Sequence, residues 1–205
     1  MRSIIGLAAV TFVVAVGSLS AARINNPVIQ NQYGTGQSSV ERRPENQFVS
    51  TVNAMATRRA KAVLDSKSGS TVSGEVTFTE KQGGVEISIK VKGATPGPHG
   101  VHLHENGDCA AADAQSAGGH FNPDKTAHGA PHGAVHHGGD LGNMTVRANG
   151  AGELKLTVKG LTVSEGAHSV VGRAFIVHAG ADDLKSQPAG NSGARFACGV
   201  VKATS

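Results

Sequence analysis

Short segments in which apolar and polar residues alternate run through this chain from Lys61 onward. Every second residue of 85–91 (VEISIKV) is apolar, and 72–79 shows the same pattern more loosely. Successive side chains of a β-strand point to opposite faces of a sheet, so an alternation of period two is typical of strands with one buried face. The turn residues at 81–84 (KQGG) separate the two segments, which together predict a β-hairpin.

Further segments with strand character follow, and turn residues such as Asn149-Gly150 and Lys159-Gly160 separate them. No segment here keeps a helical period, and about eight short strands with turns between them predict an all-β barrel or sandwich. The 28 glycines and the scarcity of aromatic residues agree with short strands and many turns. The further strands are expected at 99–104, 143–148, 153–158, 170–178 and 195–202.

The N-terminal residues have the three parts of a secretory signal peptide. Arg2 supplies a positive start, 4–16 is apolar, and small residues follow at 17–22. The apolar stretch is shorter than the ~20 residues that a membrane-spanning helix needs, although a retained membrane anchor is the alternative. We predict a signal peptide over residues 1–21, export to the periplasm or the extracellular space, and no stable membrane span after cleavage.

The rest of the chain divides by composition into a predicted disordered polar linker over 22–59 and a folded domain over 60–205. Residues 1–59 hold six Lys/Arg and two Asp/Glu, which accounts for the whole net charge of +4. Residues 60–205 hold thirteen of each kind and are neutral. A neutral body without a basic stripe argues against a nucleic-acid-binding protein.

Two long segments, 105–142 and 179–194, lack the strand pattern and are rich in Gly, Ala, Asp and His. Loops of this length inside a compact domain are usually functional or held in place by a ligand. We therefore expect the chemistry of the protein to lie in these two segments.

Most of the ten histidines lie between His99 and His137, a density typical of metal-binding segments. His102 and His104 are two residues apart in a predicted strand, so both point to the same face. His178 ends another apolar run and could supply a ligand from a second strand. Three or four nitrogen ligands suit copper or zinc.

A second set of candidate ligands lies in the first long loop. Three histidines and a carboxylate suit a closed tetrahedral zinc site, which would also hold a loop that lacks secondary structure. A metal-storage tract or a simple bias of composition is the alternative. The set consists of His120, His128, His137 and Asp140, whereas His99, His132, His136 and His168 have no spacing partner and are predicted to be ordinary surface or turn histidines.

The chain has two cysteines, Cys109 and Cys198. An even count in an exported chain favours one disulfide. In a cytosolic protein two buried free thiols are the better interpretation, so the compartment decides between them.

Five segments occur in an order and at a spacing that resemble those of the Cu/Zn superoxide dismutase family. The resemblance covers about residues 60–205 and implies an eight-stranded antiparallel Greek-key barrel with two long functional loops. The segments are 102–108 (HLHENGD), 118–123 (GGHFNP), 139–143 (GDLGN), 172–178 (GRAFIVH) and 190–199 (GNSGARFACG).

The resemblance implies one copper and one zinc ion per subunit and assigns a role to each matching residue. His102, His104 and His178 resemble copper ligands, His120 the imidazolate that bridges copper and zinc, and His128, His137 and Asp140 the other zinc ligands. Asp182 resembles the aspartate that links a copper histidine to a zinc histidine, here His102 and His128. Arg195 resembles the active-site arginine, and Cys109 and Cys198 the intrasubunit disulfide.

The implied activity is the disproportionation of superoxide to dioxygen and hydrogen peroxide, with His120 as a proton donor and Arg195 attracting the anion. The rival interpretations are a non-catalytic metal-binding or copper-delivery protein of the same fold, and a sandwich whose histidines buffer metals on a cell surface. Loss of a copper ligand or of Arg195 would favour the first rival, and neither is lost.

The chain also differs from common eukaryotic members. Cys109 follows Gly107-Asp108 directly, which is similar to the bacterial periplasmic branch. The loop after His178 begins Ala179-Gly180 and lacks the Glu-Lys pair typical of eukaryotic members, which puts guidance of the substrate by that lysine in doubt.

A homodimer is possible, but the two branches of the family pair through different surfaces. The triplet at 143–145 (NMT) is a glycosylation sequon, which matters only in a eukaryotic secretory pathway.

Overall fold

Backbone pairing closes eight strands into a barrel in this computed structural model, which describes residues 57–204. The predicted signal peptide and nearly all of the predicted linker lie outside the described residues. The strands are β1 (Arg59–Ser66), β2 (Ser73–Lys81), β3 (Gly84–Lys92), β4 (Gly97–His104), β5 (Asp140–Val146), β6 (Gly152–Lys159), β7 (Ala174–His178), β8 (Arg195–Val200) and the short β9 (Lys202–Thr204).

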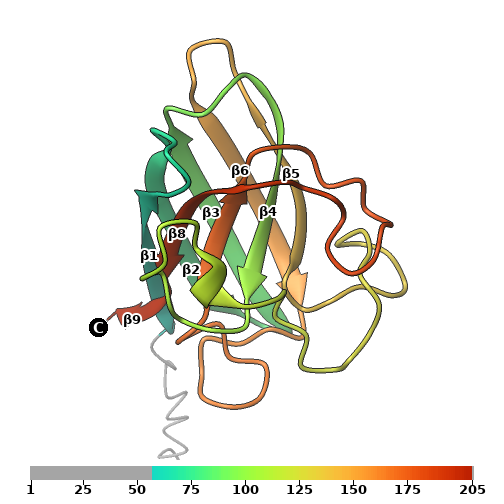
Figure 1. Cartoon of the computed structure of the whole chain (residues 1–205). Coiled ribbons are helices and arrows are strands. Elements are labelled where there is room, and N and C mark those ends of the chain that lie inside the picture. The colour runs from blue at the N-terminus through green and yellow to red at the C-terminus, as the bar shows by residue number, and fades with distance from the viewer. Residues whose placement is uncertain (1–56, 205) are drawn as a thin grey trace, which may run out of the picture. The chain divides into compact units, whose positions relative to one another are not determined.

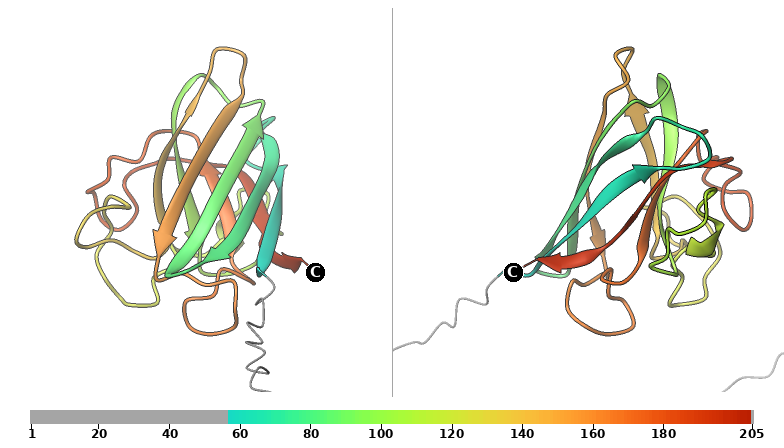
Figure 2. Two further views of the ribbon diagram at one scale, coloured as in Figure 1. Left: turned by 180° about the vertical axis from the view of Figure 1, so that it is seen from behind. Right: turned by 60° about the vertical axis from the view of Figure 1, so that its left-hand side comes forward.

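The strands run antiparallel in the order β2-β3-β6-β5-β4-β7-β8-β1, and β1 pairs back to β2 (Figures 1 and 2). The neighbours β3-β6-β5-β4 form a Greek key, since the meander β4-β5-β6 places β6 beside β3. β9 continues the line of β8 along β1. The predicted all-β Greek-key barrel is confirmed, with β9 as an additional strand.

The predicted hairpin is the pair β2–β3, in register from Ser73↔Lys92 to Lys81↔Gly84. Gly83 at its turn has a φ of 81°, a left-handed conformation that glycine adopts without steric cost. The alternating residues of β3 point into the barrel, where Ile87 and Ile89 are buried. The core also holds Phe78 and Phe175, whose rings meet edge to face with centroids 6.4 Å apart.

The strand β1 was not among the predicted strands, because its inward residues Ala60 and Ala62 give a weak hydrophobic signal. It begins at Arg59, which the sequence placed in the linker, and the preceding carbonyl of Arg58 accepts a hydrogen bond from the Glu80 amide. β1 closes the barrel, since it pairs with β2 on one side and with β8 and β9 on the other.

Two predicted strands are shorter than expected. The segment 170–178 forms a strand only from Ala174, because Val170–Arg173 make a turn in which Gly172 has a φ of 79°. The segment 195–202 is interrupted at Val201, whose N–H and C=O bond to Arg173 and Gly172 instead of to β1.

The loops 105–139 and 179–194 lie side by side against the same side of the barrel (Figures 1 and 2). They cover the outer faces of β4 and β7, and all five residues of β7 are buried. A small second apolar cluster lies beneath the first loop and contains Ala114, Ala117, Ile176 and Cys198. The only helical element among the described residues is the 3₁₀ turn η1 (Gln115–Ala117) in that loop.

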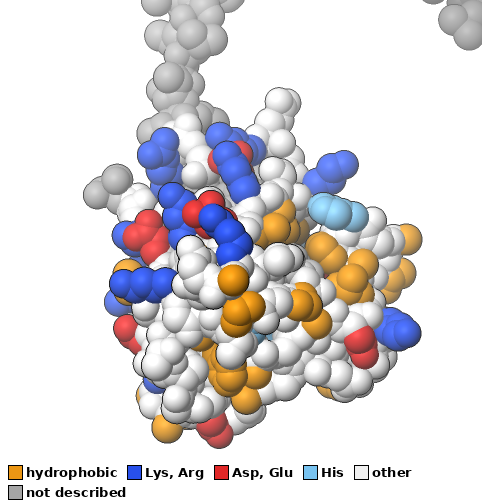
Figure 3. Space-filling view, turned by 90° about the horizontal axis from the view of Figure 1, so that it is seen from above, with side chains coloured by type: hydrophobic (Ala, Val, Ile, Leu, Met, Phe, Trp, Pro, Cys, Tyr) orange, Lys and Arg blue, Asp and Glu red, His pale blue; other side chains and the backbone are white. Residues whose placement is uncertain are grey.

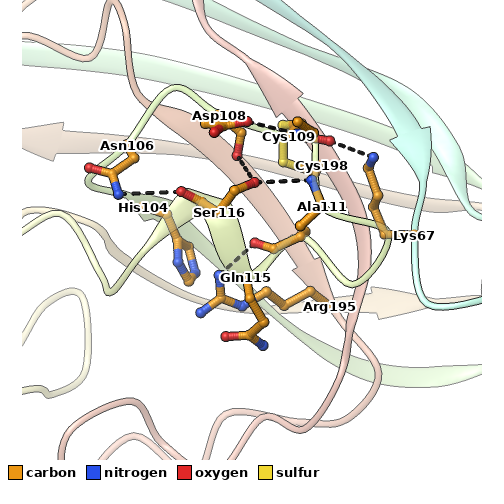
Figure 4. Close-up of a disulfide and its surroundings, with 12 residues drawn as sticks. Lys67, His104, Asn106, Asp108, Cys109, Ala111, Gln115, Ser116, Arg195 and Cys198 are labelled. Atoms are coloured by element: carbon orange, nitrogen blue, oxygen red, sulfur yellow. Dashed lines mark hydrogen bonds between the residues drawn. A yellow bond between two sulfur atoms is a disulfide. The ribbon is translucent and has the colours of Figure 1, made fainter.

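Cys109 and Cys198 form a disulfide that ties this loop to β8 (Figure 4). The neighbouring chain is fastened as well, since Lys67 donates from Nζ to the Cys109 carbonyl and Ser116 Oγ donates to the Asp108 carbonyl at 3.1 Å. The first loop is therefore fixed by both a covalent bond and hydrogen bonds.

Most of the Lys and Arg side chains on the face drawn in Figure 3 gather at the upper left, with Asp and Glu among them, and hydrophobic side chains are spread over the centre and the right. Within residues 57–204 no helix has the length and apolar character needed to cross a membrane.

A chain that starts at Thr57 should keep the barrel, whereas a chain that starts at Lys67 should not. Removing β1 exposes the edges of both β2 and β8 and takes Leu64 out of the core. Thermal unfolding followed by circular dichroism should give one cooperative transition for the first chain and none for the second. A cooperative transition without β1 would contradict its closing role.

Replacing both cysteines by Ala should lower the free energy of unfolding by up to about 4 kcal/mol, since the disulfide closes a separation of 89 residues. Urea unfolding of the double variant measures the loss, and chemically reduced wild-type protein is the matched comparison. Equal stability of the oxidised protein and the double variant would show that the bond contributes nothing.

Candidate metal centre

The metal-ligand candidates begin on β4, a strand with both faces buried. Val101 and Leu103 point into the barrel core, and the alternate residues His102 and His104 point outward beneath the loops. β4 pairs with β7, which ends at His178. The isolated bridge between His104 and His120 brings the first loop to the same place.

Two groups of buried side chains result, and within each group one possible ligand atom per residue lies within 4.8 Å of all the others. His120 belongs to both groups. The first group is His102, His104, His120 and His178, and the second is His120, His128, His137 and Asp140.

His120 presents a different nitrogen to each group. Its Nδ1 lies 2.8 Å from Asp140 Oδ1, in the second group. Its Nε2 has no hydrogen-bond partner and remains for the first group. Asp140 Oδ1 also lies 3.0 Å from His128 Nδ1 and 3.3 Å from His137 Nδ1, so one carboxylate oxygen faces three ring nitrogens.

Hydrogen bonds at the other ring nitrogens fix the orientation of most of these histidines. His104 Nδ1 donates to the Gly118 carbonyl at 2.9 Å, and His178 Nδ1 donates to the Gly193 carbonyl at 3.2 Å. His102 Nε2 and His128 Nε2 donate to the two carboxylate oxygens of Asp182, at 2.8 and 3.0 Å. Metal-binding histidines usually make such a bond from the nitrogen that does not face the metal.

The opposite ring nitrogens give an independent test of whether the residues fit metal ions. In residues 57–204, seven buried side-chain nitrogen or oxygen atoms have no hydrogen-bond partner, and six of them are imidazole nitrogens of these two groups. Buried polar atoms are nearly always hydrogen-bonded, so the convergence of these six atoms in two groups fits metal ligation. These atoms are His102 Nδ1, His104 Nε2, His120 Nε2, His128 Nδ1, His137 Nδ1 and His178 Nε2. Two of them, His128 Nδ1 and His137 Nδ1, face the Asp140 carboxylate without forming a hydrogen bond to it.

Burial favours the uncharged imidazole, which is the form that binds a metal. It lowers the pKa of His102 and His104 well below the usual value and that of His178 to about 4. For Asp140, burial would raise the pKa, but the His120 side chain and the N–H groups of His137 and Gly129 donate to the carboxylate and hold its pKa below the usual value.

Asp182 is itself positioned by Asn143. The Asn143 amide accepts from the Asp182 N–H at 2.7 Å and donates to the Asp182 carbonyl at 2.8 Å. Asn143 is the first residue of the predicted sequon, and a glycan would attach to the nitrogen that donates this bond. Glycosylation at Asn143 would therefore disturb the residue that links His102 and His128.

Arg195 is held by the first loop, although it begins β8. Its Nη1 and Nη2 donate to the carbonyls of Ala114 and Gly118, both at 2.8 Å. Figure 4 shows the guanidinium group near the His104 ring and Gln115. Both loops contribute to a pocket lined by His104, His120, His137 and His178, and Arg195 is the only Lys or Arg among its described lining residues.

The prediction for His99 is wrong. It is a core residue with 1% exposure, and its Nδ1 lies 2.7 Å from the carbonyl of His178. His99 and Val101 are two residues apart on β4 and therefore point to the same, inward face. The predicted strand 99–104 already implied this. His132 is exposed, as predicted, and the partly exposed His168 pairs with Asp124 at 3.0 Å. His136 is half-buried and donates to the His137 carbonyl.

Sequence reasoning missed Gln187, whose side chain binds the backbone of His128, and it missed the contact of Asn143 with Asp182. The first contact joins residues 59 apart in the chain and the second joins residues 39 apart, so no local spacing could have indicated them.

Comparisons with known proteins agree with this geometry. A family description of Copper/zinc superoxide dismutase matches residues 72–201. A solved structure of a protein described as the clock protein EA4 is 38% identical, with a TM-score of 0.64, and the match covers 70% of this chain and 93% of that chain. The chain belongs to the Cu/Zn superoxide dismutase family.

Proposed function

We propose that this protein is a superoxide dismutase with one copper and one zinc ion per subunit. The observation that carries the proposal is the set of six buried imidazole nitrogens that form no hydrogen bond and lie in two groups that share His120. The first group has only nitrogen donors and would hold copper, and the second has a carboxylate as well and would hold zinc.

Copper, when bound, supplies one-electron chemistry because it alternates between two oxidation states, which zinc does not. The overall reaction converts two superoxide anions and two protons into dioxygen and hydrogen peroxide. One proton would come from Nε2 of His120, the nitrogen that faces the first group, and the other from water. Asp140 holds the opposite side of that ring through Nδ1.

Arg195 would bind and orient the anion at the pocket. The two loop carbonyls hold its guanidinium group in place, and five N–H donors leave some free beyond those two bonds. Asp182 would keep His102 and His128 in the correct tautomer, since it accepts from both rings.

A non-catalytic role is the second candidate, because one similar solved structure is that of a protein described as a clock protein. The complete ligand groups and the fixed arginine favour catalysis in this chain. Superoxide turnover that rises in proportion to copper content would support catalysis, and copper-loaded protein without turnover would support the alternative. We further propose export of the protein, since its disulfide suits an oxidising compartment.

Elemental analysis of the metal-loaded protein should give one copper and one zinc per chain. His104→Gln should reduce the copper content and leave zinc in place, whereas His137→Gln should reduce zinc, since each residue belongs to one group only. His132→Ala is the matched control, because His132 is exposed and outside both groups. Retention of two zinc ions and no copper would contradict the redox function.

Arg195→Ala should lower the rate about 10-fold or more without loss of either metal, since it removes the local attraction for an anion but no ligand. Arg195→Glu should be worse. The wild-type rate should fall as salt rises, and the Ala variant should respond less, because screening acts over about 10 Å at 0.1 M salt.

The matched control is Arg147→Ala, which removes an exposed arginine paired with Glu153 and outside the pocket. Equal rates and equal salt dependence in wild type and Arg195→Ala would exclude Arg195 from the mechanism.

A further inference from the structure

His128 is anchored from the opposite loop at three separate atoms. Its ring Nε2 donates to Asp182, and its backbone N–H and C=O both bond to the side chain of Gln187. Asp182 and Gln187 both belong to the loop 179–194. His128 lies well inside the loop 105–139, in a part of the described chain where no strand pairing holds the backbone in place.

The side-chain amide of Gln187 forms two hydrogen bonds with the backbone of His128, as paired residues of neighbouring β-strands do. Oε1 accepts from the His128 N–H at 2.9 Å, and Nε2 donates to the His128 carbonyl at 2.9 Å. Nε2 also donates to the Lys185 carbonyl at 3.2 Å, which aligns the amide. Both polar atoms of the Gln187 side chain are therefore engaged.

The backbone of the loop 179–194 packs closely against His128 and Asp182 at Gly190. Gly190 lies so close that a Cβ there would come within 1.8 Å of Asp182 Oδ1 and 2.7 Å of His128 Nε2. The pocket that contains Arg195 is also lined by Gln187, Pro188, Ala189 and Asn191. The same short piece of chain thus holds His128 and forms one wall of the pocket.

We infer that Gln187 is a positioning residue that couples zinc binding at His128 to the placement of the loop 179–194. The inference rests on the proposed zinc site. Zinc bound by His128 fixes the backbone that Gln187 holds, and this in turn fixes the pocket wall. Coupling of this kind is reciprocal, so loss of the Gln187 contacts weakens zinc binding.

The test replaces Gln187 by Met, which keeps the length of the side chain but removes both hydrogen bonds, and by Ala. Gln187 is exposed, so neither change disturbs the barrel core. The matched control is Gln115→Met, because Gln115 is also exposed and lines the same pocket, and its side chain makes no hydrogen bond to another described residue.

The first measurement is zinc affinity, by competition of the zinc-loaded protein with a chromophoric chelator. Gln187→Met and Gln187→Ala should bind zinc about 10- to 100-fold more weakly than wild type, the range expected when a residue that orients a metal ligand is lost. Gln115→Met should match wild type. Wild-type affinity in Gln187→Met would show that packing alone acts here and would overturn the inference.

The second measurement is hydrogen–deuterium exchange with and without saturating zinc. In wild type, zinc should slow exchange across 179–194, and in Gln187→Met this protection should be lost while protection at 128–140 persists. Equal zinc protection of 179–194 in both proteins would overturn the coupling. A wild-type protein that binds no zinc would instead overturn the proposed function, so the two failures are distinguishable.

Discussion

The strand β4 is the constraint on which the rest of the structure depends, because both of its faces are buried for different reasons. Val101 and Leu103 pack in the barrel, and His102 and His104 are covered by loops. A shift of pairing by one residue would send the histidines into the core and the apolar side chains outward. The register with β7, from Val101↔Val177 to His104↔Ala174, therefore fixes the fold and the site together.

The loops have almost no secondary structure of their own, so side chains must hold them. The disulfide ties one loop to β8, Arg195 bonds two carbonyls of that loop, and Asp182 joins one histidine of each group. Asn143 in turn holds Asp182 from β5. Each of these contacts crosses between segments, so the loops are ordered by the barrel and by each other.

Local spacing and the family resemblance were enough to predict part of the fold and all seven residues of the two candidate ligand groups. Alternation predicted the hairpin β2–β3 and the shared face of His102 and His104, because both depend on neighbouring residues. It could not predict β1, whose inward alanines are weak signals. It did contain the burial of His99, which shares a face of the strand with Val101, but not the hydrogen-bond partner of His99, which lies 79 residues away. The contact of Gln187 with His128 was also missed, because the two residues lie 59 apart in the chain and an exposed glutamine belongs to no hydrophobic pattern.

The buried imidazole nitrogens that form no hydrogen bond lower the stability of the folded protein, and the closed barrel has to offset this loss. A buried polar atom without a partner destabilises a protein by about 1–3 kcal/mol. Four of the six imidazole nitrogens have no partner, because His128 Nδ1 and His137 Nδ1 face Asp140 Oδ1 at 3.0 and 3.3 Å. Asp140 and Asp182 relieve only the nitrogens that they contact. A closed barrel of eight strands, joined to the first loop by a disulfide, can hold these rings together despite that cost. The stability of the barrel thus keeps the rings in place, and a metal ion bound by each of the two groups would remove this cost.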